Sequence, residues 1–353
     1  MYRDYRNKDV QFFYVYKSVQ HPEINNFLSA FTLEERLKHV AEAKRRFKSE
    51  IPWICDNMNN DVKHAFGSAP NGEFVLDPEG KVVHKYFWSN PARLRKDLAE
   101  LVGPSETVTK VEDLPTRFEP KPRKIASGVV PPIKLPGGLT ALKTTPIPGK
   151  KGEPFFAKLR AEATKDALGK KGEGKLYLGI NLDPLYEVHW NNRAGRVAIK
   201  ITAPDGVTVT PNELKSDEIK ANADVDPRQF LVSVSGTNEK PTLDIAVTYT
   251  VCDDAETFCR TLQQNYKVTF ERNKDGGSRP GIFMPAMFAK VRDFDKNGDG
   301  NVTKDELPEG RRTLYIGHID YNANEIIEKA EIDRFLAMYN NGRGLTSDKN
   351  DGQ

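Results

Sequence analysis

Side chains that carry oxygen recur at regular intervals in Asp295–Glu306, DKNGDGNVTKDE. A calcium-binding loop places its ligands at positions 1, 3, 5, 7, 9 and 12, with Gly at position 6 where the chain turns sharply. Here those ligand positions are held by Asp295, Asn297, Asp299, Asn301 (through its carbonyl), Thr303 and Glu306. A surface turn is also rich in Asp, Asn and Gly, but it does not require Glu at position 12. The segment therefore predicts a site for Ca²⁺, a hard cation that prefers oxygen ligands.

A second segment of the same length follows at Asp320–Glu331, DYNANEIIEKAE. Its ligand positions are held by Asp320, Asn322, Asn324, Ile326 (through its carbonyl), Glu328 and Glu331. Position 6 is Glu325 in place of Gly, and a side chain at positive φ costs about 1 kcal/mol. Two outcomes stay open: a strained, weaker calcium site, or a loop that pairs with the first and holds no ion.

The two segments resemble the paired EF-hand loops of calmodulin-like proteins. The resemblance implies a helix-loop-helix pair over 283–342, with Val302 and Ile327 at the positions where the two loops pair. Calcium-switched signalling would need an exposed Met-rich groove, and five Met in the whole chain argue against it.

The first hundred residues alternate apolar runs with helical patterns. Val10–Tyr16 is a continuous apolar run, as expected of a strand buried on both faces. Thr32 and Glu35 form a capping box ahead of a helix. Its predicted buried stripe is Leu33, Leu37, Val40, Ala43 and Phe47. Strands are predicted at 51–55, 73–77 and 81–87, and a second helix from the cap Asn90 to Gly103.

The segment VYKSVQHPE, Val15–Glu23, resembles the iodothyronine deiodinase family, and so do IPWICDNMNN and SAPNGEFVLDPEGKVVHKY. The resemblance implies a thioredoxin-like α/β domain over 1–103 that lacks its first strand and the nucleophilic Cys or selenocysteine. Because a thiolate is the reacting group of redox chemistry in this fold, we expect no enzymatic activity from this domain. His21 is then either a remnant of an active site or a solvated loop residue. Cys55 is expected to be a buried, inert thiol.

Proline and basic residues dominate the next segment, 104–154. This composition predicts an extended linker, with a basic patch for a polyanion as the less favoured interpretation because stacking aromatic residues are lacking.

Apolar and polar residues alternate over 155–275, in RVAIKITAP, QFLVSVSG, TLDIAVTYTVC and NYKVTFER. Short alternating strands separated by turn residues predict an all-β sandwich. Cys252 and Cys259 lie at the two ends of an acidic connection, where a disulfide can form. The pair is either structural or redox-active.

This β segment resembles the immunoglobulin-like amino-terminal periplasmic domain of the bacterial reductase DsbD. In that family, a Cys pair in a similar position exchanges electrons with partner thiol proteins. The resemblance implies a thiol–disulfide partner protein and a periplasmic or secreted location.

Composition limits the kinds of partner and the location that we expect for the protein. The 53 basic and 50 acidic side chains give a net charge of +3, so no nucleic-acid partner is expected, and no apolar run is long enough to span a membrane. No signal segment follows Met1. We expect three modules, of α/β, all-β and all-α class, ahead of a disordered tail at 343–353. The expected function is calcium binding outside the cytoplasm, and the alternative is thiol–disulfide oxidoreductase activity through Cys252 and Cys259.

Overall fold

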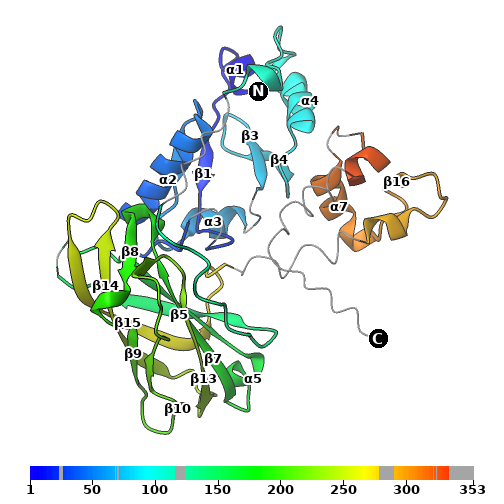
Figure 1. Cartoon of the computed structure of the whole chain (residues 1–353). Coiled ribbons are helices and arrows are strands. Elements are labelled where there is room, and N and C mark those ends of the chain that lie inside the picture. Colours follow the sequence, from blue (N-terminus) through cyan, green and yellow to red (C-terminus); the bar gives the residue numbers. More distant parts are fainter. Residues whose placement is uncertain are drawn as a thin grey trace. The chain divides into compact units, whose positions relative to one another are not determined.

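The computed structural model describes residues 1–23, 27–67, 69, 71–115, 124–150, 152–277, 290–320, 322 and 324–333 (Figure 1). The tail 343–353 lies outside this range, as does most of the two helices predicted to flank the calcium loops. In the described part of the chain, no helix is both long and apolar enough to cross a lipid bilayer.

Contacts between residues divide the chain into two compact units. The loop unit comprises Met1–Tyr14, Lys63–Pro115 and Gly281–Gln353, and the sandwich unit comprises Val15–Val62 and Thr116–Pro280. This division differs from the predicted boundary at residue 103, because residues 15–62 group with the β-rich segment.

A large antiparallel sheet dominates the sandwich unit, with strand order β10-β13-β7-β6-β5-β15-β14-β8-β12 and with β9 joining β14 to β11. The strands are β5 (Thr140–Ile147), β6 (Ala157–Ala163), β7 (Glu173–Leu182), β8 (Val188–Asn191), β9 (Ala198–Thr202), β10 (Thr208–Thr210), β11 (Glu213–Lys215), β12 (Ala223–Asp224), β13 (Arg228–Ser235), β14 (Thr242–Asp253) and β15 (Cys259–Arg272). Short helical segments interrupt them at α5 (Lys165–Leu168), η2 (Pro184–Tyr186) and η3 (Asn192–Ala194).

The predicted alternation along β14 is confirmed by burial. Its inward side chains are each at most 2% exposed, namely Leu243, Ile245, Val247, Tyr249 and Val251. They belong to one hydrophobic cluster with apolar residues of β6, β7, β9, β13 and β15. The core therefore lies between strands from both halves of the strand order, as in a β-sandwich.

The linker prediction is wrong for part of 104–154. Thr140–Ile147 forms β5, which pairs with β6 at its start and with β15 over the rest of its length. Upstream, the backbone N–H groups of Gly128, Val129 and Val130 donate to the carboxylate of Asp226 at 2.7–2.8 Å. A buried acceptor and paired strands hold this proline-rich segment against the sandwich.

Helix α2 (Leu33–Phe47) begins where predicted, since the Thr32 hydroxyl accepts a hydrogen bond from the Glu35 N–H at 3.2 Å. Its predicted buried stripe is wrong at three of five positions, since Ala43 is buried as predicted and Val40 is half-buried. Leu33, Leu37 and Phe47 are 46–50% exposed, and the buried face consists of Glu35, Arg36, His39, Ala43 and Arg46. The helix buries its polar side because charged partners on the sandwich unit meet it there.

The thioredoxin-like arrangement predicted for 1–103 would join its strands in one sheet. In the described residues, β1 (Tyr14–Tyr16) pairs with β2 (Trp53–Cys55), while β3 (Glu73–Leu76) and β4 (Val82–Tyr86) form a separate hairpin. Phe13, Tyr14 and Val15 are 41–51% exposed, so the prediction of a strand buried on both faces is also wrong. An apolar run alone does not show whether a second layer covers it.

The loop unit is built from short elements. These are α1 (Tyr2–Tyr5), the β3–β4 hairpin, α4 (Pro91–Val102), η1 (Val111–Asp113), η4 (Val291–Phe294), β16 (Val302–Thr303), η5 (Glu309–Arg311), α7 (Arg312–Ile319) and β17 (Ile326–Ile327). Helix α3 (Asp61–Phe66) precedes the hairpin. The predicted cap of α4 is confirmed, because Asn90 Oδ1 accepts from the N–H groups of Ala92 and Arg93 at 2.9 and 3.2 Å.

Candidate metal centre

The loop Asp295–Glu306 folds around the carboxylate of its first residue. Asp295 Oδ1 accepts a hydrogen bond from the Gly298 N–H at 2.8 Å, and Oδ2 accepts one from the Gly300 N–H at 2.9 Å. Gly300 has a φ of 86°, in the region that glycine occupies without strain. The turn at position 6 therefore directs the backbone N–H groups of the loop toward the carboxylate at position 1.

The next two side chains on the ligand pattern repeat this arrangement. Asn297 Oδ1 accepts from the Asp299 N–H at 2.9 Å, and Asp299 Oδ1 accepts from the Asn301 N–H at 2.7 Å. Asn297 Nδ2 also donates to Asp299 Oδ2 at 2.9 Å. These local bonds hold the side-chain oxygens of positions 3 and 5 along the inside of the turn.

Glu306 closes the loop at position 12. Its Oε2 accepts from the Thr303 N–H at 2.8 Å and from the Thr303 hydroxyl at 2.9 Å, and its Oε1 accepts from the Lys296 N–H at 3.0 Å. The hydrogen bonds from Thr303 lower the pKa of the Glu306 carboxyl. The carboxylate form, which a cation requires, is thus the favoured one.

The second loop, Asp320–Glu331, shares part of this internal bonding. Asp320 accepts from the N–H groups of Asn324 and Glu325 at 3.2 and 3.1 Å, and the bond from position 6 corresponds to the one that Asp295 accepts from Gly300. Glu331 accepts from the Glu328 N–H at 3.0 Å and from the Asn322 N–H at 3.1 Å. The two loops therefore have in common the hydrogen bond from the N–H at position 6 to the carboxylate at position 1 and the one from the N–H at position 9 to the Glu at position 12.

Position 6 of the second loop has the predicted backbone conformation. Glu325 has a φ of 65°, close to the 86° of Gly300 in the first loop. Its carboxylate is solvent-exposed and lies 3.2 Å from Lys304 Nζ of the first loop. The side chain points away from the loop interior, so the strain is confined to the backbone of Glu325 and leaves the ligand side chains in place.

The two loops pair through β16 and β17. Val302 lies opposite Ile327, as predicted, and both side chains are fully buried. They belong to a small core with Val291, Leu307, Tyr315, Ile319 and Ile332. A bond from the Lys329 N–H to Asn301 Oδ1 at 3.2 Å also crosses between the loops. The two loops are therefore joined by strand pairing, by a shared apolar core and by a hydrogen bond.

The donor set of each loop suits a hard cation, because its side-chain donors are carboxylate and amide oxygens, with the Thr303 hydroxyl added in the first loop. Among the residues that the structure describes, no three His, Cys, Asp or Glu side chains converge as a group able to hold a metal ion. In both loops the carboxylates accept hydrogen bonds from backbone N–H groups of the loop. A carboxylate oxygen has two lone pairs, so one that accepts an N–H retains capacity for a cation.

The predicted bond between Cys252 and Cys259 is present. These residues are register partners on β14 and β15, and their sulfur atoms form a disulfide. Cys252 is 4% exposed, whereas Cys259 lies at the surface. Asn191 Nδ2 lies 3.4 Å from the Cys252 sulfur and 3.8 Å from the Cys259 sulfur. One sulfur is thus open to a reagent, and an amide donor contacts both.

Sequence reasoning missed the polar residues beside this disulfide. His189 is the register partner of Cys252 across β8 and β14, and its Nδ1 lies 3.1 Å from Asp254 Oδ1. Asn191, two residues further along β8, is the residue that contacts the sulfur atoms. The alternation of HWNN placed His189 and Asn191 on one face of the strand, but only the sheet register shows that this face meets the Cys pair.

Two other candidates lie outside the segments that form the loops and the disulfide. His21 is half-buried in the segment before α2. Cys55 is half-buried, not fully buried as predicted, and burial raises the pKa of its thiol. An elevated pKa disfavours the thiolate, in agreement with the expectation of an inert residue.

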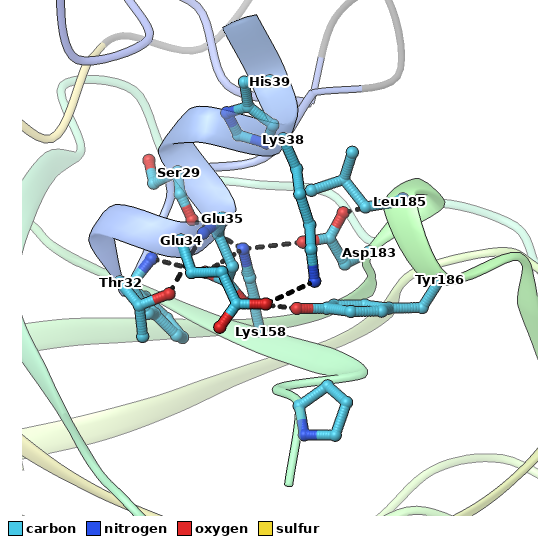
Figure 2. Close-up of polar contacts among 12 residues, drawn as sticks. Ser29, Thr32, Glu34, Glu35, Lys38, His39, Lys158, Asp183, Leu185 and Tyr186 are labelled. Carbon is cyan, nitrogen blue, oxygen red and sulfur yellow. Dashed lines mark hydrogen bonds and ion pairs between the residues drawn. The ribbon is translucent and has the colours of Figure 1, made fainter. Parts of the chain in front are cut away.

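A buried ionic cluster that the sequence did not indicate connects α2 to the sandwich (Figure 2). Lys158 Nζ lies 2.9 Å from Glu35 Oε2 and 2.6 Å from Asp183 Oδ2, and these three side chains are at most 4% exposed. Tyr186 donates from its hydroxyl to Glu35 Oε1 at 3.0 Å. The positive charge of Lys158 compensates the negative charges of two carboxylates that would otherwise be buried without a cation.

No protein-family model matches this sequence, and no curated protein is significantly similar to it. The function is therefore inferred from the geometry of the loops and of the disulfide.

Proposed function

We propose that the chain binds calcium through two paired loops of the EF-hand type, Asp295–Glu306 and Asp320–Glu331. The observation that carries the proposal is the shared bonding scheme of the loops. In each, the carboxylate at position 1 accepts the N–H at position 6, and the Glu at position 12 accepts the N–H at position 9.

Prior organisation of the ligands supports the proposal in energetic terms. A loop whose turn is already formed loses less conformational entropy on binding than an unfolded segment would. A cation that binds the folded loop and not the unfolded chain stabilises the folded state by mass action. Calcium would supply the positive charge that draws the carboxylates of positions 1, 5 and 12 inward.

The role that fits best is structural, in a protein located outside the cytoplasm. A disulfide between Cys252 and Cys259 favours an oxidising compartment. Extracellular calcium modules have dissociation constants of about 10⁻⁴ to 10⁻³ M, which suits loops of modest charge.

Calorimetric titration of the full chain with calcium tests the proposal. Asp295→Ala and Glu306→Gln each remove a carboxylate ligand, and we expect each to weaken the first site about tenfold or more. Asp305→Asn is the matched control, because the Asp305 side chain is 95% exposed outside the ligand positions. Absence of binding heat at millimolar calcium, or an equal loss in the control, would contradict the proposal.

The disulfide supports a second candidate function, thiol–disulfide exchange with a partner protein. The exposed Cys259 and the amide of Asn191 near both sulfur atoms favour it. A partner thiolate would attack the Cys259 sulfur, forming a mixed disulfide and releasing Cys252 as a thiolate. A second partner thiol would then displace Cys259, leaving the partner oxidised and the pair reduced.

A trapping experiment separates this exchange from a purely structural disulfide. In Cys252→Ser, the free Cys259 should form a lasting mixed disulfide with a thioredoxin-type protein that keeps one active-site Cys, activated as an aromatic disulfide. Cys259 displaces the aromatic thiol, and neither protein then holds a second thiol that could resolve the bond. Cys259→Ser should trap far less, because Cys252 is buried. Equal trapping by both variants, or none by either, would leave a structural role only.

A further inference from the structure

Asp320, the first residue of the second loop, is hydrogen-bonded both within its own loop and to other parts of the loop unit. The N–H of Asp320 donates to the Ile316 carbonyl at 3.2 Å, at the end of α7. The carboxylate of Asp320 accepts from the loop at Asn324 and Glu325. Its carbonyl accepts from Asn90 Nδ2 at 2.6 Å. Asp320 is 2% exposed, so these four bonds satisfy its polar groups without help from solvent.

The polar groups of Asn90 are also divided between its own element and another one. Its Oδ1 caps α4 by accepting from Ala92 and Arg93, and its carbonyl accepts from the Leu94 N–H at 3.0 Å. Only its Nδ2 is directed at the calcium loop, 230 residues away in sequence. With Asn90 5% exposed, the amide group acts as a buried connection between the start of α4 and the start of the second loop.

We propose that Asn90 is a positioning residue of the second loop, one that couples calcium binding there to the N-terminus of α4. The inference rests on the proposed calcium function and adds a residue outside both loops. Fixing the Asp320 carbonyl orients the backbone that carries the position-1 carboxylate. Because coupling between two sites is reciprocal, calcium in the second loop should in turn stabilise the first turn of α4.

The substitution Asn90→Ser separates the two roles of the side chain. Serine caps a helix about as well as asparagine, so α4 keeps its cap, but it has no amide to reach the Asp320 carbonyl. Asn191→Ser is the matched control in the sandwich unit. Asn191 also caps a helical turn, η3, through Oδ1 and donates from Nδ2 to another group.

The calcium affinity of each loop is measured separately in the full chain, with a substitution that weakens calcium binding by the other loop. With Glu306→Gln as background, calcium titration reports the second loop, and Asn90→Ser should weaken it about threefold to tenfold. With Glu331→Gln as background, the first loop should bind as before in Asn90→Ser. Asn191→Ser should leave both loops unchanged.

Amide hydrogen exchange supplies a readout independent of affinity. In the Glu306→Gln background, calcium should slow exchange at Ala92 and Arg93, and Asn90→Ser should abolish that slowing. The inference would be overturned if Asn90→Ser left the calcium affinity of the second loop unchanged, or if calcium did not alter amide exchange in α4. It would also be overturned if the second loop bound no calcium while the first loop did. Failure of both loops to bind would instead overturn the proposed function itself.

Discussion

At the scale of residues, the turn of both loops at position 6 could be predicted because the spacing that requires it is local. A loop that must turn at position 6 shows this requirement in its own twelve residues, and the positive φ of Glu325 follows from the same rule. The buried positions of His39 and Lys158 could not be predicted. Lys158 meets Glu35, which lies 123 positions away in the sequence, and His39 contacts Tyr16 and Phe27, which belong to separate local segments.

Glu325→Gly should relieve the strain in the second loop. Glycine adopts a φ of 65° without the steric penalty of a Cβ, although its greater freedom in the unfolded chain offsets part of the gain. We expect the free energy of unfolding of the loop unit to rise by about 0.5–1 kcal/mol, relative to Glu325→Gln. Denaturant unfolding without calcium measures this difference.

Glu325→Gln is the proper reference because it keeps the Cβ and removes only the exposed ion pair with Lys304. Calcium affinity of the second loop should improve with glycine for the same reason. A glycine variant that is less stable than the glutamine variant would show that Glu325 is not strained.

His39 should make the sandwich unit sensitive to acid. It is fully buried, its Nδ1 lies 2.9 Å from the Tyr16 hydroxyl, and no described residue satisfies Nε2. Burial lowers the pKa of His39 to about 4 from its ordinary 6.5, and the nearby Lys158 cation acts in the same direction. Because the folded state binds the proton more weakly, stability is fully present above pH 6.5 and is lost as pH falls from 6.5 toward 4.

The measurement is the free energy of unfolding at pH 7 and at pH 4.5 for the wild type and for His39→Gln. The wild type should lose about 2 kcal/mol more than the variant over this interval. His21→Gln, at a histidine outside the buried cluster, should behave as the wild type does. Parallel pH profiles for the wild type and His39→Gln would refute the argument.

At the scale of elements, periodicity predicted the strands of the sandwich well but assigned the wrong face of α2 to the interior. Alternation along a strand such as β14 identifies its buried face when the other face is polar. Helix α2 has an apolar face and a charged face, and either can be buried if a partner suits it. Glu35 meets Lys158 of β6, so the charged face is the one that packs on the sandwich (Figure 2).

Removing the lysine should detach the helix from this strand. Lys158→Met leaves the Glu35 and Asp183 carboxylates buried without a cation, and we expect a loss of about 3–5 kcal/mol in the free energy of unfolding. Lys143→Met is the matched control, because Lys143 pairs with Glu271 in a bridge whose side chains are 53% and 40% exposed. Exposed bridges contribute about 0–1 kcal/mol.

Chemical unfolding of the two methionine variants measures both values in one experiment. Equal losses in Lys158→Met and Lys143→Met would show that the buried cluster does not hold α2 in place.

At the scale of the whole molecule, the sequence indicated three modules, whereas contacts divide the chain into two units. The β-rich segment and the pairing of the loops 295–306 and 320–331 could be predicted because each carries its own pattern. The division of the first hundred residues was not predicted, because Val15–Val62 groups with the sandwich unit and Lys63–Pro115 with the loop unit. Contacts such as Asn90 with Asp320 join segments that are distant in sequence, and no local pattern encodes them.

Locating a bound cation in crystals of the full chain tests the calcium proposal most directly. Terbium is a hard, oxygen-preferring substitute for calcium, and its anomalous scattering marks its position. We predict a peak inside the loop Asp295–Glu306, within ligand distance of Asp295, Asp299 and Glu306, that excess calcium displaces and that Glu306→Gln removes. A map without a peak in either loop at saturating terbium, or with peaks only at surface carboxylates elsewhere, would contradict the proposal.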